Sequence, residues 1–103
     1  MNNNTSISVT YPDERLRTLV EEYITMQKHE FTFGGLCSYV LYWAKEEGFT
    51  LNESLYESDL LHPNDSKRVS KIIQQVAREG RINVICGDDG LYVDETQFEK
   101  VGE

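Results

Sequence analysis

The chain has 103 residues, enough for one small domain, and its 39% hydrophobic content supports a modest core. It carries 10 Lys and Arg against 18 Asp and Glu, a net charge of −8, which argues against indiscriminate nucleic-acid binding by the whole surface. No apolar run approaches the roughly 20 residues that span a bilayer, and residues 1–9 lack the basic and apolar parts of a signal peptide, so we expect a cytoplasmic protein.

The N-terminal part of the chain predicts a tail followed by a helix. Residues 1–12 are expected to be a polar tail with a short strand, because apolar and hydroxyl side chains alternate over residues 6–11. Residues 13–30 are expected to hold an additional helix, with Pro12 at its first position. The apolar face of that helix consists of Leu16, Leu19, Val20, Tyr23 and Ile24.

A second helix is predicted over residues 33–47. Its inner face consists of Leu36, Cys37, Val40 and Ala44. Gly48 followed by apolar Phe49 is typical of a left-handed helix C-cap with a hydrophobic contact. A short strand over residues 49–51 should come next.

A short helix is expected from about residue 52 to residue 61, with an ambiguous start because two capping boxes overlap there. Residues 62–65 predict a turn, in which Asn64 or Asp65 caps a longer helix over about residues 66–79. Gly80 is expected to end that helix.

The segment 66–81 has the opposite charge to the rest of the chain. It contains five Lys or Arg and one Glu, a net charge of +4, so the other 87 residues carry −12. At 100° per residue, Lys67, Lys71, Gln74 and Arg78 lie opposite an apolar stripe. That stripe consists of Val69, Ile72, Ile73, Val76 and Ala77. A basic helix on an acidic body favours contact with a polyanion.

The end of the chain predicts a hairpin and a tail. Residues 82–86 alternate as a strand, residues 87–90 form a turn signal, and residues 91–93 predict the second strand. Residues 95–103 are expected to be an acidic tail, with Phe98 and Val101 as candidate anchors.

This order of elements over residues 31–93 resembles a winged helix-turn-helix domain of the prokaryotic regulator type. Residues 49–51 match its first strand, residues 53–61 the first helix of the helix-turn-helix, residues 66–79 its recognition helix, and residues 81–93 its wing. The string VSKIIQQVAREGRI, residues 69–82, is similar to the end of such recognition helices. The resemblance implies an α+β fold, with a three-helix core and C-terminal β-hairpin wing over residues 31–94, plus the extra N-terminal helix.

The resemblance also implies a sequence-specific transcriptional regulator that binds double-stranded DNA through helix 66–79. The expected DNA-binding residues are Lys67, Arg68, Lys71, Gln74, Gln75, Arg78 and Arg81. Two features disfavour phosphate contact. The expected wing tip holds Asp88 and Asp89, and the preceding helix is acidic.

Two other functions stay open. One is a winged-helix protein–protein interaction module whose basic face meets an acidic protein partner. The other is a small acidic inhibitor of phage type that mimics nucleic acid, which the charge of −12 outside the basic segment suggests. A homodimer would suit palindromic DNA. Its candidate interface residues are Tyr23, Tyr39, Tyr42 and Trp43, unless the aromatic rings simply pack beneath the 13–30 helix.

We expect no enzyme activity, metal or cofactor. His29, His62, Cys37 and Cys86 have no metal-site spacing, and Cys37 lies on an apolar face. Gly34 and Gly35 lack the Lys and Ser or Thr of a phosphate-binding loop, and no Ser or Cys has the context of a nucleophile.

Overall fold

The computed structural model describes residues 7–51, 60–86, 92 and 95–101. Over these residues the fold is α+β, as expected, with three helices and two small antiparallel sheets. The helices are α1 (Asp13–Met26), α2 (Phe33–Glu47) and α3 (Pro63–Arg78). The strands are β1 (Ser8–Val9), β2 (Glu30–Thr32), β3 (Thr50–Leu51), β4 (Ile82–Cys86) and β5 (Gln97–Lys100).

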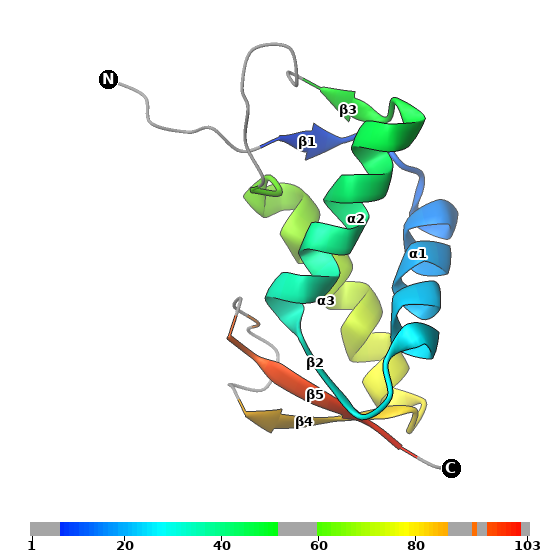
Figure 1. The fold of residues 1–103 in the computed structure, drawn as a ribbon, viewed down its shortest axis with the longest axis vertical. Helices are drawn as coiled ribbons and strands as arrows, with labels where there is room; N and C mark the ends of the chain where they lie inside the picture. Colours follow the sequence, from blue (N-terminus) through cyan, green and yellow to red (C-terminus); the bar gives the residue numbers. More distant parts are fainter. Residues whose placement is uncertain (1–6, 52–59, 87–91, 93–94, 102–103) are drawn as a thin grey trace.

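The three helices lie side by side, with one sheet at each end of the helical layer (Figure 1). Each helix turns an apolar face inward, and one continuous core joins all three. The helix predicted as an addition therefore belongs to the core, to which α1 contributes Leu16, Leu19, Val20 and Ile24. No helix of the described residues is long and apolar enough to cross a membrane.

The predicted bounds of α2 are confirmed. Thr32 caps its N-terminus by accepting a hydrogen bond from the Gly35 amide at 3.0 Å. Gly48 ends it with a φ of 79°, in the left-handed region that glycine adopts without strain. The predicted bounds of α1 need two corrections. It ends at Met26, and Pro12 is its N-cap residue instead of its first helical position.

Helix α3 begins three residues earlier than predicted. His62 is its N-cap and accepts a hydrogen bond at Nδ1 from the Asn64 amide at 3.1 Å, while Pro63 takes the first helical position. Neither Asn64 nor Asp65 is the cap, so that prediction was wrong. The apolar stripe is confirmed, because Val69, Ile72, Ile73 and Val76 are all buried.

The larger sheet has the strand order β2–β5–β4, and both pairs are antiparallel. Its central strand β5 lies in the part of the chain that we expected to be an acidic tail. Phe98 is fully buried there, and its ring stacks on that of Phe31 at 5.2 Å. The strand that pairs with β4 is thus β5, and Tyr92, the described residue of the predicted strand 91–93, lies outside any strand and packs its ring against Phe98. The predicted turn at residues 87–90 lies outside the described residues.

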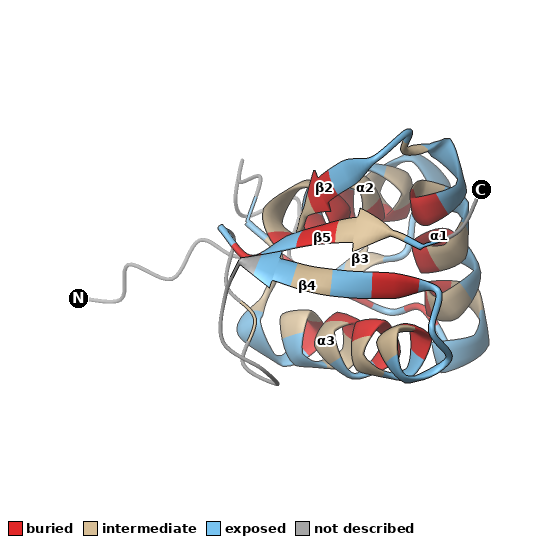
Figure 2. Ribbon diagram, turned by 90° about the horizontal axis from the view of Figure 1, so that it is seen from below, coloured by how far each residue is buried: buried red, intermediate tan, exposed pale blue. Residues whose placement is uncertain are grey.

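The predicted strand at residues 49–51 exists as β3, but it pairs with β1. The strand that joins the C-terminal strands is β2, which the sequence did not predict. Leu61 forms a bridge with Ile7, so it is extended and not helical as predicted. Leu60 is not helical either, and the rest of that expected helix, residues 52–59, falls outside the described residues. Seen from the end of the molecule, the larger sheet covers the helices, and α3 lies beside β4 (Figure 2).

Candidate nucleic-acid interface

The outer face of α3 carries three exposed cations. Lys67, Lys71 and Arg78 are exposed, and none of them has an ion pair with any described residue. They lie within about 60° of the helix circumference together with Gln74, opposite the buried stripe. The hydrophobic side of α3 fixes this orientation, so the face points away from the core with a charge of +3.

Arg68 is held differently from these three residues. Its Nε and Nη2 atoms both donate to Oδ1 of Asp13, at 3.2 and 2.8 Å. Its Nη1 atom donates to Oδ1 of Asp65 at 3.1 Å, and Nη2 also donates to the carbonyl oxygen of Tyr11. Arg68 therefore faces the N-terminal end of α1 instead of the outer face of α3.

Asp65 fixes the position of the Arg68 guanidinium. Its side chain is only 8% exposed, and its second oxygen, Oδ2, accepts a hydrogen bond from the Val9 amide at 3.1 Å. Both oxygens are thus satisfied, as a buried carboxylate requires. The network joins β1, the start of α1 and the first turn of α3, and so fixes the position of the basic helix.

Gln75 and Arg81 are also engaged with α1. Arg17 donates to Gln75 Oε1 at 3.2 Å and forms ion pairs with Glu21 at 2.8 Å and Glu79 at 3.1 Å. Arg81 pairs with the same two acids, at 3.3 and 3.7 Å. The net charge of this cluster is zero, from two arginines, Arg17 and Arg81, and two acids, Glu21 and Glu79. The hydrogen bond from Arg17, helped by Arg81 and opposed by burial, lowers the pKa of Glu21.

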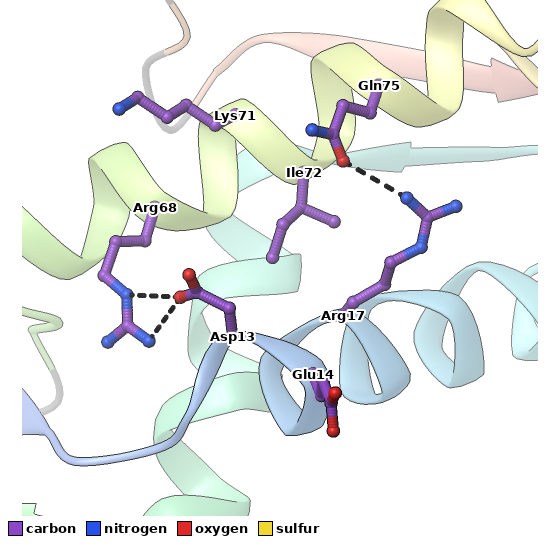
Figure 3. A pocket seen from close by; sticks show the side chains of 7 residues that line it. All are labelled: Asp13, Glu14, Arg17, Arg68, Lys71, Ile72 and Gln75. Atoms are coloured by element: carbon purple, nitrogen blue, oxygen red, sulfur yellow. Dashed lines mark hydrogen bonds and ion pairs between the residues drawn. The ribbon is translucent and has the colours of Figure 1, made fainter.

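A cavity of about 410 Å³ lies between α1 and α3, beside the outer face of α3 (Figure 3). Ile72 lies at the centre of its lining, with charged side chains around it. The lining residues are Asp13, Glu14, Arg17, Arg68, Lys71, Ile72 and Gln75.

The seven predicted DNA-binding residues thus fall into two groups. Lys67, Lys71, Gln74 and Arg78 share the outer face of α3, whereas Arg68, Gln75 and Arg81 contact residues of α1 or acids beside it. Sequence reasoning missed the partners Asp13, Arg17 and Glu21. Arg68 is 55 positions from Asp13, so only the packing of α1 on α3 brings the pair together.

The four candidate dimer residues form a chain of ring contacts that leads outward. Tyr23 packs against Phe31 and, at 5.2 Å, against Tyr39, so part of the aromatic surface does pack on α1. The rings of Trp43 and Tyr42 continue the chain, and Tyr42 is 56% exposed. The dimer interface stays a prediction.

The acids expected to oppose phosphate contact, at residues 53–59 and 88–89, lie outside the described residues. Among the residues that the structure does describe, no three His, Cys, Asp or Glu side chains come together as metal ligands. Cys37 is buried, as its place on the apolar face of α2 predicts. No protein-family model, no curated protein and no solved structure matches this chain.

Proposed function

We propose that this protein binds double-stranded DNA through the outer face of α3, as a winged-helix transcriptional regulator. The observation that carries the proposal is the set of three cations on that face without an acidic partner among the described residues. An α-helix fits the major groove, and Gln74 on the same face is a residue type that pairs with adenine edges.

The order of elements supports a winged-helix arrangement, although with a different assignment from the one the sequence suggested. Helix, strand, helix, helix and two strands occur in the order α1, β2, α2, α3, β4 and β5. Helix α1 and strand β2 then take the roles that we had assigned to residues 33–51. One difference is strand β3, which follows α2 and precedes α3.

The proposal predicts a specific salt dependence. If the three cations each neutralise one phosphate, log K against log salt has a slope of about −2.7 per bound chain, at 0.9 per contact. Affinity for a short duplex should then fall about 40-fold between roughly 50 and 200 mM salt. Fluorescence anisotropy of labelled duplex DNA measures both quantities. Wild-type protein that does not bind at low salt refutes the proposal.

A matched pair of variants separates the position of a charge from the net charge. Lys71→Glu and Lys28→Glu change the net charge equally, and Lys28 is exposed just beyond the end of α1, so it is not part of the outer face of α3. We expect Lys71→Glu to reduce affinity at least about tenfold, because it loses one phosphate contact and adds a repulsion. Lys28→Glu should cost much less. Equal losses would assign the effect to net charge alone.

The acids beside α3 favour a second candidate, an interaction module for an acidic protein. Asp13 and Glu14 border the cavity, and Glu79 ends the helix. These acids repel a continuous phosphate backbone but leave room for a partner with few, separated carboxylates. Purification of a stable acidic partner, without DNA retardation at low salt, would favour this function. The nucleic-acid-mimicking inhibitor stays a hypothesis.

A homodimer would suit the proposed regulator, because two copies of α3 about 34 Å apart can read two half-sites. The exposed ring of Tyr42 is the best probe of this. Sedimentation of Tyr42→Ala against wild type tests whether the aromatic surface of α2 joins two chains.

A further inference from the structure

The α1–α3 cavity contains an arginine whose anion-binding edge is already occupied by a carboxylate of the same chain. Arg68 has five N–H groups. Two of them donate to acceptors that the fold holds in place, one to the Tyr11 carbonyl and one to Asp65. Two others, on Nε and Nη2, both point to the single oxygen Oδ1 of Asp13. The Nε–Nη2 edge is the fork that binds an oxyanion with two parallel hydrogen bonds.

The protein holds this fork in place independently of Asp13. Asp65 is buried and the Tyr11 carbonyl belongs to the backbone, so both remain when Asp13 moves away. Asp13 itself is 86% exposed, in contrast to 31% for Arg68. An ion pair with one fully solvated partner is weak, and a stronger anion can replace it. The Asp13 carboxylate thus stands where an external oxyanion would bind.

Two further groups favour an anion at the same place. Lys71 lies three residues after Arg68 on α3, lines the same cavity and has no ion pair among the described residues (Figure 3). The N-terminus of α1 has no side-chain cap, so the positive end of its dipole is also directed there. The charged groups of the lining sum to +1, from three cations and two acids, and to +2 without Asp13.

We propose that this cavity binds one phosphate group of the DNA backbone, held by Arg68 and Lys71, and that the phosphate displaces the Asp13 carboxylate from Arg68. This inference rests on the proposed function and adds a contact to it. It makes Asp13 a residue that weakens DNA binding, because each phosphate must first compete with it. The guanidinium needs no rearrangement to accept the phosphate, since its other partners stay in place.

Asp13→Asn tests the competition without disturbing the core, and Glu14→Gln is its control. Each change removes one exposed negative charge from the first turn of α1, and both residues line the cavity. Glu14 has no ion pair with a described residue, so its loss frees no cation. Both variants should bind duplex DNA more tightly. The gain should be larger for Asp13→Asn, because only the Asp13 carboxylate has to leave Arg68 before the phosphate binds.

The expected gain in affinity for Asp13→Asn is about two- to fivefold, the factor that corresponds to loss of one exposed ion pair. In a Lys71→Gln background, Asp13→Asn should give a smaller gain than in wild type, because the cavity phosphate then has one cation instead of two. Circular dichroism of each variant establishes that the fold is intact.

A second measurement tests the site without DNA. Inorganic phosphate is titrated into ¹⁵N-labelled protein, and the Arg68 Nε resonance is followed by NMR. It should shift at millimolar phosphate in Asp13→Asn and much less in wild type. A shift with phosphate but no DNA binding by either protein would make the cavity a site for free phosphate and would overturn the DNA contact.

The outcomes separate this inference from the proposed function. DNA binding with equal gains in affinity for Asp13→Asn and Glu14→Gln overturns the phosphate site and leaves the outer face of α3 as the interface. No DNA binding by wild type at low salt refutes the proposed function and the DNA contact together. A larger gain in affinity for Asp13→Asn than for Glu14→Gln supports both.

Discussion

Replacement of Asp65 by alanine should destabilise the protein and release α3 from β1. The Asp65 carboxylate is buried and accepts hydrogen bonds from the Val9 amide and from Arg68, both at 3.1 Å. Alanine leaves the Val9 amide without an acceptor in a buried position. Arg68 loses one hydrogen-bond acceptor but keeps Asp13 and the Tyr11 carbonyl as partners.

The magnitude follows from these two contacts. An unsatisfied buried amide costs about 1–3 kcal/mol. The half-exposed ion pair with Arg68 adds at most about 1 kcal/mol after screening by solvent. The total is about 1–4 kcal/mol, and at about 4–8 °C per kcal/mol Tm should fall by at least about 4 °C. Asp65→Asn keeps one acceptor oxygen and should cost about 1 kcal/mol.

Urea unfolding followed by circular dichroism measures the free energy of unfolding of these variants. Glu14→Ala is the matched control, because it removes an exposed acid from the first turn of a helix, and it should stay within about 0.5 kcal/mol of wild type. If Asp65→Ala costs no more than this control, the buried network does not hold α3 in place. The argument from Asp65 would then fail.

Three further predictions concern stability. A Cβ at Gly35 would lie 2.5 Å from the Tyr23 hydroxyl, so Gly35→Ala should destabilise wild type. In a Tyr23→Phe background, where this hydroxyl is absent, the same change should stabilise the protein by up to about 1 kcal/mol, because alanine favours helix over glycine. A double-mutant cycle from thermal melts measures the coupling between the two positions, and no coupling contradicts the prediction. The folded pKa of Glu21 is lowered below its ordinary 4.5 by the hydrogen bond from Arg17, so its stabilisation is complete above that value and is lost as pH falls through the folded pKa. Glu21→Gln should therefore flatten the acid side of the stability–pH curve, and an unchanged curve would exclude this contribution. Gly80 has a φ of 81°, so Gly80→Ala should cost about 1–2 kcal/mol in the same urea assay, and a neutral effect would argue against the left-handed helix end.

The sequence predicted the helical faces well because they depend on local spacing. The bounds of α2 and the buried stripe of α3 follow from the 3.6-residue period and from Gly48 and Gly80. The sheet was predicted poorly. Strand β2 has three residues, and β5 is the polar sequence QFEK, so neither shows the alternation that marks a strand. Phe31, two residues before Phe33, and Phe98, between Gln97 and Glu99, were the available signals.

The candidate site was predicted in part. Lys67, Lys71 and Arg78 share a face because helical geometry requires it. The pairing of Arg68 with Asp13 could not be predicted, since it depends on how two helices pack and not on either helix alone. His62 is outside the usual set of N-cap residues, so the helix start was placed at the more common Asn64 and Asp65.

The central place of β5 has a consequence for the order of folding. The pair Phe31 and Phe98 is separated by 98 − 31 = 67 residues, so the larger sheet closes a loop of most of the chain. Closure of so long a loop costs entropy before its contacts form, and such contacts slow folding. The three helices can bring their apolar faces together through shorter loops. We therefore expect the helical layer to assemble first and β5 to join late, as the strand that closes the structure over an already formed core.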